Sequence, residues 1–439
     1  MKQYTTYIAT AAAILFTIAG CDNTDYTNKA PFDNAAYINV AESKETESVL
    51  FKRTITKQEK ELAATLAYPA GQDIEVHFKA DPTLAAVYNA RHNTKYETLS
   101  DEHYELSASS VVIPTGKTLS TPIMVYFKAL DLLEIDATYL LPVTIANTSG
   151  GISILDGSKT IYYLVKRSSA ITTAANLEHA YVEVSNFYMP NGGTPNPSAA
   201  CVNDMKAVTY EAIIRVNSFD ADTEISSIMG VEQYMCMRLG DANFQRQQLQ
   251  LEGPGGKFPG SNKSKLLNPG EWYHIALTYD IAAKTMIFYV NGKEQSRVTE
   301  YGGSSITSVS IGNKQLPKAD GTGGDFLFYI GRSYGERNDI SRQLNGEICE
   351  CRIWNVARTA QQIWDNMYNI ENPESEDNLA AYWKFNEGSG VDIIDHSKYG
   401  NNAKIVPYWQ DAAGANPYEL KDSSIWPSGI EIPQVNKEN

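Results

Sequence analysis

The stretch between residues 325 and 367 restricts the fold of this 439-residue chain more than any other. Its first apolar run, 326–330, predicts a short strand that ends at Gly331, and a polar loop follows. Residues 346–354 then alternate with a period of two, which predicts a second strand. One face of that strand carries Cys349, Cys351 and Ile353, and the other carries Ile348, Glu350, Arg352 and Trp354.

A short helix is predicted directly after this strand. Thr359 and Gln362 have the spacing of a capping box, and two apolar pairs four residues apart follow. The order strand, glycine-flanked loop, strand and capped helix resembles the closing part of laminin-G-like, concanavalin A-type jelly rolls. The matching residues are Ile330-Gly331, Gly346, Ile348, Glu350, Arg352, Ile353, Trp354, Asn355 and Ala357-Arg358-Thr359. Cys349 and Cys351 depart from the pattern, because family members more often carry Asp and Val there.

A second block of the same region resembles the middle hairpin of that family. It consists of Trp272-x-His274-x-Ala276, a turn at Asp280 and the run Phe288-Tyr-Val-Asn-Gly292, whose Asn-Gly pair is a strong hairpin signal. The resemblance implies a jelly roll over residues 177–407, with residues 408–439 as a tail packed on it. Trp272, Trp354 and Trp383 lie in strand motifs and are predicted to be core residues.

Residues 35–167 predict a separate domain. Short apolar strands broken by turn signals favour a Greek-key, immunoglobulin-like β-sandwich, with a helical insert at residues 83–90. The region resembles N-terminal β-sandwich domains of unknown function that precede lectin or glycosidase modules in surface lipoproteins of Gram-negative glycan-degrading bacteria. The matching residues are Val87-Tyr88-Asn89, Tyr104-Glu-Leu106, Val112-Ile113-Pro114-x-Gly116 and Tyr139-Leu-Leu-Pro142-Val-Thr-Ile145. Residues 168–176 are predicted to be a linker, and the predicted fold class is all-β throughout.

The first twenty residues have the pattern of a targeting segment. Lys2 precedes a short apolar run, and Ile18-Ala19-Gly20-Cys21 closes it, which resembles a bacterial lipobox. The resemblance implies a lipoprotein signal peptide over 1–20, lipidation of Cys21 and a tether over 21–34. We therefore expect an outer-membrane, cell-surface protein that is anchored by lipid alone.

The net charge of −15 argues against binding to nucleic acids, because an acidic surface repels phosphates and no basic tract offsets it. Apart from Cys21, four cysteines remain. An oxidising compartment allows them to form disulfides, although a bridge between next-but-one strand neighbours has unfavourable geometry. Disulfides and buried free thiols both stay open for Cys201, Cys236, Cys349 and Cys351.

No carboxylate pair of the kind that cleaves glycosidic bonds stands out. Glu134 and Asp136 lack the final acid of the glucanase signature, and Glu347 and Glu350 are expected on opposite faces of their strand. The chain is therefore predicted not to be an enzyme. Non-catalytic binding of an extracellular glycan is the favoured function.

Sugars bind through aromatic platforms and fixed polar groups. Aromatic residues in predicted loops and in the tail are therefore the candidates for glycan binding: Tyr301, Tyr334, Tyr408, Trp409 and Trp426. Oxygen-rich loops suggest calcium as a cofactor, although ordinary Asx turns explain them better. The calcium candidates are Asp241, Asn243, Asp320, Asp325, Asp339 and Asp395.

Two other functions stay open. The chain could be a structural or protein-interaction module of a glycan-uptake complex, with other surface lipoproteins or an outer-membrane transporter as partners. It could also be a glycoside hydrolase with an acid pair that the sequence does not reveal.

Overall fold

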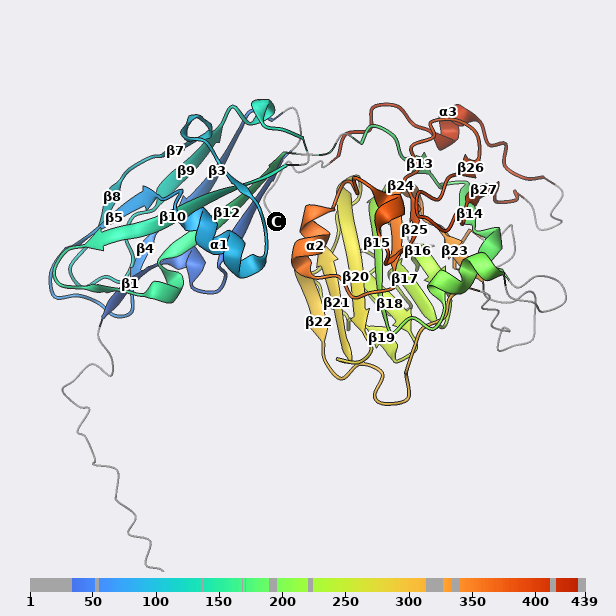
Figure 1. Cartoon of the computed structure of the whole chain (residues 1–439), viewed down its shortest axis with the longest axis horizontal. Helices are drawn as coiled ribbons and strands as arrows, with labels where there is room; N and C mark the ends of the chain where they lie inside the picture. The colour runs from blue at the N-terminus through green and yellow to red at the C-terminus, as the bar shows by residue number, and fades with distance from the viewer. Residues whose placement is uncertain are drawn as a thin grey trace, which may run out of the picture.

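The computed structural model describes residues 34–51, 55–135, 137–167, 169, 171–188, 196–219, 224–312, 327–333, 340–410 and 416–432. Two β-sandwiches follow each other along the chain and lie side by side (Figure 1). The prediction of an all-β fold is confirmed. Residues 1–20, Cys21 and most of the tether lie outside the described residues. None of the helices in the described part of the chain is long and apolar enough to cross a lipid bilayer.

The first sandwich has two layers around a shared apolar core. One layer has the order β2 (Thr46–Phe51), β12 (Thr160–Arg167), β10 (Thr138–Thr148), β5 (Ile74–Ala80) and β8 (Ser110–Ile113), with β6 (Glu97–Thr98) beside β10. The other layer consists of two three-stranded sheets. They are β11 (Ser153–Ile154), β1 (Ala35–Ile38), β4 (Ala64–Leu66), and β3 (Lys57–Leu62), β9 (Ile123–Lys128), β7 (Tyr104–Leu106). Helix α1 (Leu84–His92) is the predicted insert.

The second sandwich has a seven-stranded and an eight-stranded sheet. The seven-stranded sheet has the order β13 (Ala175–Asn176), β24 (Gly346–Trp354), β15 (Ala207–Val216), β20 (Trp272–Asp280), β21 (Thr285–Val290) and β22 (Lys293–Val298), with β25 (Leu379–Trp383) beside β24. The eight-stranded sheet has the order β19 (Gly256–Phe258), β18 (Leu249–Gly253), β17 (Met235–Leu239), β16 (Ser226–Val231), β23 (Phe328–Ile330), β14 (Ala180–Glu183), β27 (Ala403–Pro407) and β26 (Asp392–Ile393).

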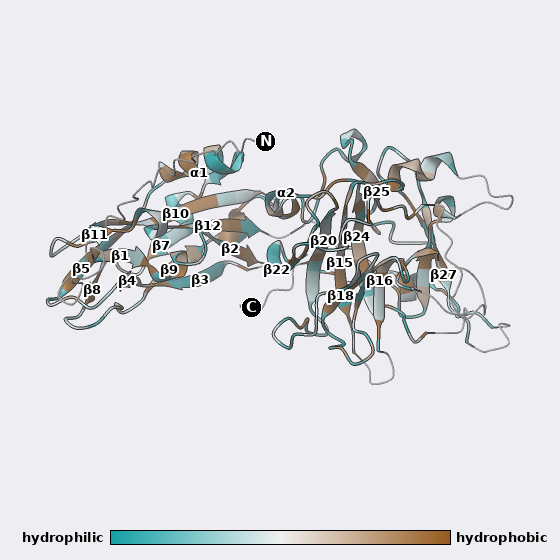
Figure 2. Cartoon of the chain, turned by 90° about the horizontal axis from the view of Figure 1, so that it is seen from below, coloured by the Kyte–Doolittle hydropathy of each residue, from teal (hydrophilic) through white to brown (hydrophobic). Residues whose placement is uncertain are grey.

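Helices are few and short in this second part. They are α2 (Ala360–Asp365) and α3 (Asp422–Ile425). Short 3-10 helices occupy connections in both sandwiches: Asn39–Ala41, Asp101–His103, Leu130–Leu132, Asp156–Ser158, Ser185–Phe187, Pro197–Val202 and Pro373–Ser375. Figure 2 shows apolar residues concentrated in the strands, as two stacked sheets require.

The core of the second sandwich contains the inward faces of both sheets, including Trp272 and Trp383. Trp354 is also buried, in a small cluster on the other face of β24. The predicted alternation of β24 fails at one position. Glu350 has a positive φ of 54°, and the pairing of β24 with β15 shifts register at this point. Because a bulge turns the preceding residues over, Ile348 lies opposite Ile214 in the core instead of facing outward, and Cys349 lies opposite Ile213 on the face that carries Glu211.

Helix α2 covers the outer face of the seven-stranded sheet. Its predicted capping box is confirmed, because the Thr359 side chain accepts from the backbone N–H of Gln362 and the Gln362 side chain accepts from that of Thr359. Ile363 packs on Ala276 and Tyr289 of the sheet. The helix therefore closes this face with apolar contacts.

A buried group of charges fixes the same helix to the sheet. Glu211 on β15 accepts hydrogen bonds from His274 Nε2 at 3.1 Å and from Arg358 Nη1 at 3.0 Å. Arg352 Nη1 lies 3.5 Å from Glu211 and donates to the Asn366 carbonyl at 2.7 Å. Arg358 also donates to the Asn366 side chain. Both arginines thus connect the centre of the sheet to the C-terminal end of α2.

Burial and neighbouring charges set the pKa values of Glu211 and His274. Burial alone would raise the pKa of Glu211, but Arg358, the hydrogen bond from His274 and Arg352 outweigh it and hold that pKa well below its usual range. Burial also lowers the pKa of His274 and outweighs the opposing effect of Glu211. Glu211 is therefore ionised and His274 neutral near pH 7.

Helix α2 also contacts the first sandwich. Lys166 Nζ on β12 donates to the carbonyls of Trp364 at 3.2 Å and Asp365 at 3.0 Å, and the Tyr96 hydroxyl donates to the Asp365 carboxylate. Side chains of α1 and β12, among them Tyr88, belong to the same apolar cluster as Trp364. The two sandwiches are therefore packed through α2.

Replacing Glu211 with Gln should destabilise the second sandwich. The variant leaves Arg352 and Arg358 buried without a full counter-charge, and breaking a buried ion pair in this way costs about 3–5 kcal/mol. Scanning calorimetry should show a lower melting temperature. Glu294→Gln is the matched control, because its pair with Arg297 is 42–46% exposed and is worth at most ~1 kcal/mol. Equal, small effects of both substitutions would contradict a structural role for Glu211.

The stability of the protein should fall as the pH drops below about 6.5, the pKa of an unfolded histidine. His274 has a lowered pKa when folded, so the unfolded chain binds a proton that the folded chain does not, and folding weakens with falling pH. His274→Gln should flatten the slope of unfolding free energy against pH between about 5 and 6.5. His77→Gln, which changes an exposed side chain, should leave the slope unchanged. The idea fails if both variants keep the slope of the natural protein.

Candidate functional site

Three of the predicted sugar-binding aromatics are buried, and Tyr301 and Tyr408 are the most deeply buried of them. Tyr301 is 6% exposed, donates its hydroxyl proton to the Gly256 carbonyl at 2.5 Å and packs edge-on against Tyr279. Tyr408 is fully buried and donates to the Gly331 carbonyl at 3.4 Å. A buried ring offers no face to a sugar, so the prediction that these two rings are platforms is wrong. Their aromatic surface stabilises the core instead.

The other three aromatics differ in their surroundings. Trp426 is 8% exposed and donates its Nε1 proton to the Gly390 carbonyl, so it too packs on the sandwich rather than standing free. Trp409 is half-buried and pairs with Pro417 in an isolated bridge. Tyr334 lies outside the described residues.

The calcium candidates that the structure describes either bond to other protein groups or lie apart from the other candidates. Asp241 pairs with Arg238 at 3.1 Å and with Lys257. Asp395 accepts four hydrogen bonds, from the backbone of Tyr382, Ser397 and Asn401 and from the Ser397 hydroxyl, as an Asx turn does. Asn243 is exposed with a positive φ. Asp320, Asp325 and Asp339 lie outside the described residues, and among the described residues no three acidic, His or Cys side chains gather around a metal position.

All four cysteines of the two sandwiches are free thiols. Cys349 and Cys351 are fully buried on β24, and burial raises the pKa of both thiols well above the usual value. Burial raises the pKa of Cys201 to about 12. These thiols therefore pack as small apolar groups and do not crosslink strands.

A polar network that the sequence analysis missed lies on the outer face of the eight-stranded sheet. Its centre is Arg238 on β17, a guanidinium that is 1% exposed. Nη1 donates to Glu232 at 3.1 Å and to Glu252 at 2.7 Å, and Nε and Nη2 both donate to the Gln250 side chain. Arg238 Nη2 also pairs with Asp241. Arg238 thus holds together Gln250 and Glu252 of β18, Glu232 directly after β16 and Asp241 in the loop after β17.

The two glutamates of this network resemble an acid pair, but their geometry favours a structural role. Both accept from the same Arg238 nitrogen, and Glu232 also accepts from Arg342 Nη1 at 2.7 Å. Burial raises the pKa of Glu252, and the neighbouring Glu232 raises it further. Glu232 is 3% exposed and is engaged by two arginines. It is therefore poorly placed to reach a glycosidic bond.

An aromatic cluster continues the same face. Arg332 lies 4.5 Å over the ring of Tyr181, 5.3 Å over Tyr329 and 5.8 Å over Tyr408. Tyr188 packs edge-on against Tyr329 with ring centroids 6.1 Å apart. Tyr188 and Tyr329 are half-buried, and the Tyr188 hydroxyl donates to the Phe328 carbonyl at 3.3 Å.

Between the network and the rings, several buried polar atoms have no partner among the described residues. They are the hydroxyls of Ser227 and Ser333 and one side-chain oxygen each of Glu232 and Gln343. The four residues are close in the fold, because β16 pairs with β23 and the backbone of Ser227 bonds to Arg342. A signal for this face existed in the sequence. Arg238, Gln250 and Glu252 alternate with apolar residues that enter the core.

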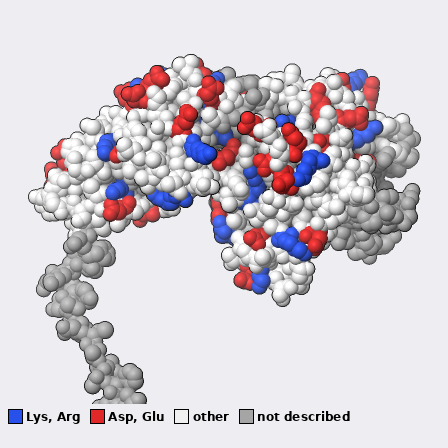
Figure 3. Space-filling model, in the orientation of Figure 1, with Lys and Arg blue, Asp and Glu red and all other residues white. Residues whose placement is uncertain are grey.

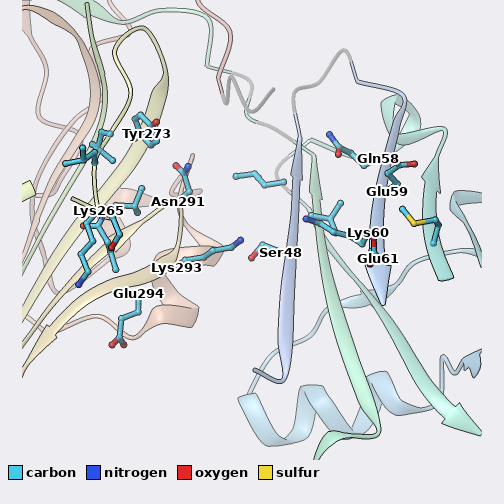
Figure 4. A pocket seen from close by; sticks show the side chains of 18 residues that line it. Ser48, Gln58, Glu59, Lys60, Glu61, Lys265, Tyr273, Asn291, Lys293 and Glu294 are labelled. Carbon is cyan, nitrogen blue, oxygen red and sulfur yellow. The ribbon is translucent and has the colours of Figure 1, made fainter. Parts of the chain in front are cut away.

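A cleft of about 940 Å³ separates the two sandwiches on the side of β22 (Figure 4). Its walls come from β2 and β3 of the first sandwich, and from β22 and residues 264–267 of the second. Figure 4 shows Lys293 reaching across the cleft towards Ser48. The only aromatic ring in the lining is that of Tyr273, which is 4% exposed. On the face of the whole protein shown in Figure 3, acidic and basic side chains are interspersed.

Comparison with protein families identifies the second sandwich. Residues 191–364 match the model of the Concanavalin A-like lectin/glucanases superfamily. The second sandwich is a concanavalin A-like jelly roll. Residues 32–152 match a family model described as an N-terminal domain. The resemblance drawn from β24 and α2 is thus confirmed for the jelly roll.

Solved structures that match this chain include two from Bacteroides. A candidate carbohydrate binding protein from Bacteroides ovatus is 26% identical, with a TM-score of 0.43, and the match covers 88% of this chain and 100% of that one. A two-domain protein of unknown function from Bacteroides fragilis is 11% identical with a TM-score of 0.29, over 46% of this chain and 77% of that one. A search of curated proteins found no significant match.

Proposed function

We propose that the jelly roll binds an extracellular glycan, without cleaving it, on the outer face of its eight-stranded sheet. The observation that carries this proposal is the position of the half-buried Tyr188 and Tyr329 beside the Arg238 network. A sugar presents an apolar ring face and a rim of hydroxyls, so it needs an aromatic surface next to charged and amide groups. The match to a superfamily of lectins and glucanases supports the same class of ligand.

The groups around these rings suit hydroxyl recognition. Arg342 is 25% exposed and Glu252 is 22% exposed, so both combine a fixed position with access to solvent. Charged groups form stronger hydrogen bonds than neutral ones, and their partners here hold them in place. The buried hydroxyls of Ser227 and Ser333 have no hydrogen-bond partner among the described residues, so they offer further hydrogen bonds near Arg342 and Glu252. The absence of cleavage is inferred from Glu232 and Glu252, which share one arginine nitrogen.

Electrophoresis through native gels that contain a panel of neutral and acidic polysaccharides tests this proposal. At least one polysaccharide should retard the protein, and Tyr329→Ala should weaken the association by about tenfold, equivalent to ~1.4 kcal/mol for the loss of one stacking ring. Tyr126→Ala is the control, because Tyr126 is an exposed tyrosine of the first sandwich. Repeating the gels with a chelator tests whether calcium takes part.

Three outcomes would overturn the proposal. They are no retardation by any polysaccharide, retardation that Tyr329→Ala leaves unchanged, and release of reducing sugar from the retarding polysaccharide. The last outcome would make the protein a glycoside hydrolase, and Glu252→Gln would then identify the acid. Retardation that disappears with chelator would support a calcium-dependent version of the same site.

The proposal includes anchoring of the chain to the outer membrane through a lipid on Cys21, so that the jelly roll faces the medium. The lipobox-like sequence Ile18-Ala19-Gly20-Cys21 supports it. In bacteria that express the full chain, the protein should enter the detergent phase of a Triton X-114 extraction, and Cys21→Ser should move it to the aqueous phase. Protease added to intact cells should digest the anchored protein. Partition of the natural chain into the aqueous phase, or protection from protease, would contradict this part.

A further inference from the structure

Two carboxyl groups of the Arg238 network lie against the same nitrogen atom. Glu232, directly after β16, accepts a hydrogen bond from Arg238 Nη1 at 3.1 Å, and Glu252 on β18 accepts one from it at 2.7 Å. Arg238 is 1% exposed, so water screens this place poorly and two carboxylates there repel each other. Such a pair is stable when one of the two carboxyl groups keeps a proton.

One oxygen of the pair also lacks a hydrogen bond. Glu232 is 3% exposed, and its Oε2 has no donor among the described residues. A buried carboxylate oxygen without a donor is costly. A protonated carboxyl group on Glu252 supplies such a donor, since the two side chains lie within hydrogen-bonding reach of each other. The crowded nitrogen and the oxygen without a donor therefore have the same explanation.

The surroundings place this proton on Glu252. Arg342 Nη1 donates to Glu232 at 2.7 Å, so two guanidinium groups bind that carboxylate. In the described part of the chain, Arg238 is the only arginine that donates to Glu252. Burial raises the pKa of Glu252, Arg238 lowers it, and Glu232 raises it again through its charge and a hydrogen bond, so that this pKa lies above its ordinary value.

Other ionisable groups surround the pair. Lys257 on β19 lies directly opposite Glu252 in the strand register and binds Asp241. On β17, Cys236 is the other cross-strand neighbour of Glu252, and burial raises the pKa of its thiol well above the usual value. Burial likewise raises the pKa of the Tyr301 hydroxyl. Of the described groups, Lys257 is therefore the second cation to which an ionised Glu252 can turn.

We propose that Glu232 and Glu252 share one proton, and that the loss of this proton with rising pH turns Glu252 from the Arg238 network towards Lys257. In acid solution, Glu252 donates to Glu232 Oε2 and the network is closed. When the proton leaves to water, two adjacent carboxylates remain, and their repulsion displaces the more exposed Glu252. The outer face of the eight-stranded sheet thus carries a pH-sensitive switch.

The switch also affects glycan binding, and this consequence rests on the proposed function. Glu252 is one of the partly exposed groups that face sugar hydroxyls in that proposal. A neutral side chain held by its neighbours loses less hydration and less freedom on binding than a mobile anion does. The affinity for a glycan should therefore fall as the pH rises through the titration of Glu252.

Infrared spectroscopy of the full chain carrying Cys21→Ser tests for the shared proton. A protonated carboxyl group has a carbonyl stretching band that a carboxylate lacks. At pH about 5.5, more than one unit above the ordinary glutamate pKa of about 4.3, Glu252 should still give this band. Glu252→Gln should remove the intensity of one carboxyl group. The matched control is Glu105→Gln, which changes an exposed carboxylate beside Lys128 and should leave the band unchanged.

Replacing Glu232 with Gln separates a shared proton from the effect of burial alone. The variant removes the negative neighbour but keeps Glu252, so the band should shrink as much as in Glu252→Gln. If circular dichroism shows that Glu232→Gln does not fold, Glu232→Asp takes its place, because it withdraws the carboxylate by one methylene group. A band that Glu252→Gln leaves unchanged would overturn the proposal. A band that persists when Glu232 is replaced would also overturn it, since burial alone would then hold the proton.

Measurements of glycan affinity test the link to binding. The natural sequence should bind a retarding polysaccharide severalfold more tightly at pH about 5.5 than at pH about 8. Constant affinity over this range, in a chain whose Glu252 titrates, would overturn the link. Absence of binding at every pH would overturn the proposed function instead, and the infrared bands would still decide whether the proton is shared.

Discussion

The buried carboxylate of Glu211 is the interaction on which the arrangement of the two sandwiches depends. Removing a carboxylate from water is costly, and the cost is offset here by Arg352, Arg358 and His274, which all converge on it. The same two arginines reach Asn366, the residue that ends α2. Since α2 in turn binds Lys166 and Tyr96 of the first sandwich, a charge inside the jelly roll determines how the neighbouring domain is held.

The two outer sheet faces of the jelly roll use buried charge differently. On the seven-stranded sheet, Glu211 and the arginines bound to it lie under helix α2, and their hydrogen bonds hold that helix in place. On the eight-stranded sheet the Arg238 network ends in side chains that remain partly exposed, and half-buried tyrosines adjoin it. A closed face stabilises the assembly of domains, whereas a partly open face with strong, fixed donors and acceptors can exchange water for a ligand. This contrast is the physical reason for placing the ligand on the second face.

The sequence predicted the elements whose signals are local. The existence of strand β24, the capping box of α2 and the Asn-Gly turn between β21 and β22 each depend on residues within a few positions of one another. The inward turn of Ile348 could not be predicted, because it follows from a bulge that only pairing with β15 creates. Strand β2 pairs in parallel with the distant β12, so its place at the edge of its sheet is likewise set by contacts far along the chain.

The functional surfaces were harder to predict, because they depend on burial. Tyr301 and Tyr408 look like surface aromatics in the sequence, since loops and tails are usually exposed, yet each packs into the core through contacts with residues far along the chain. Arg238 is the opposite case. Its charge suggests exposure, but partners on β18 and in the segments after β16 and β17 allow it to be buried.

The cleft between the sandwiches is the feature that sequence patterns predict least. Nothing in residues 46–51 indicates that they will face residues 293–295, because that proximity arises only when α2 docks on β12 and α1. Each edge strand alone would be an ordinary sheet end, and charged side chains such as Lys293 and Glu294 would protect it from pairing with another chain. Docking brings three such edges to one cavity, whose lining carries both lysines and glutamates. A shift of α2 would therefore alter the cleft, while the Arg238 face, on the other sheet, would keep its own set of bonds.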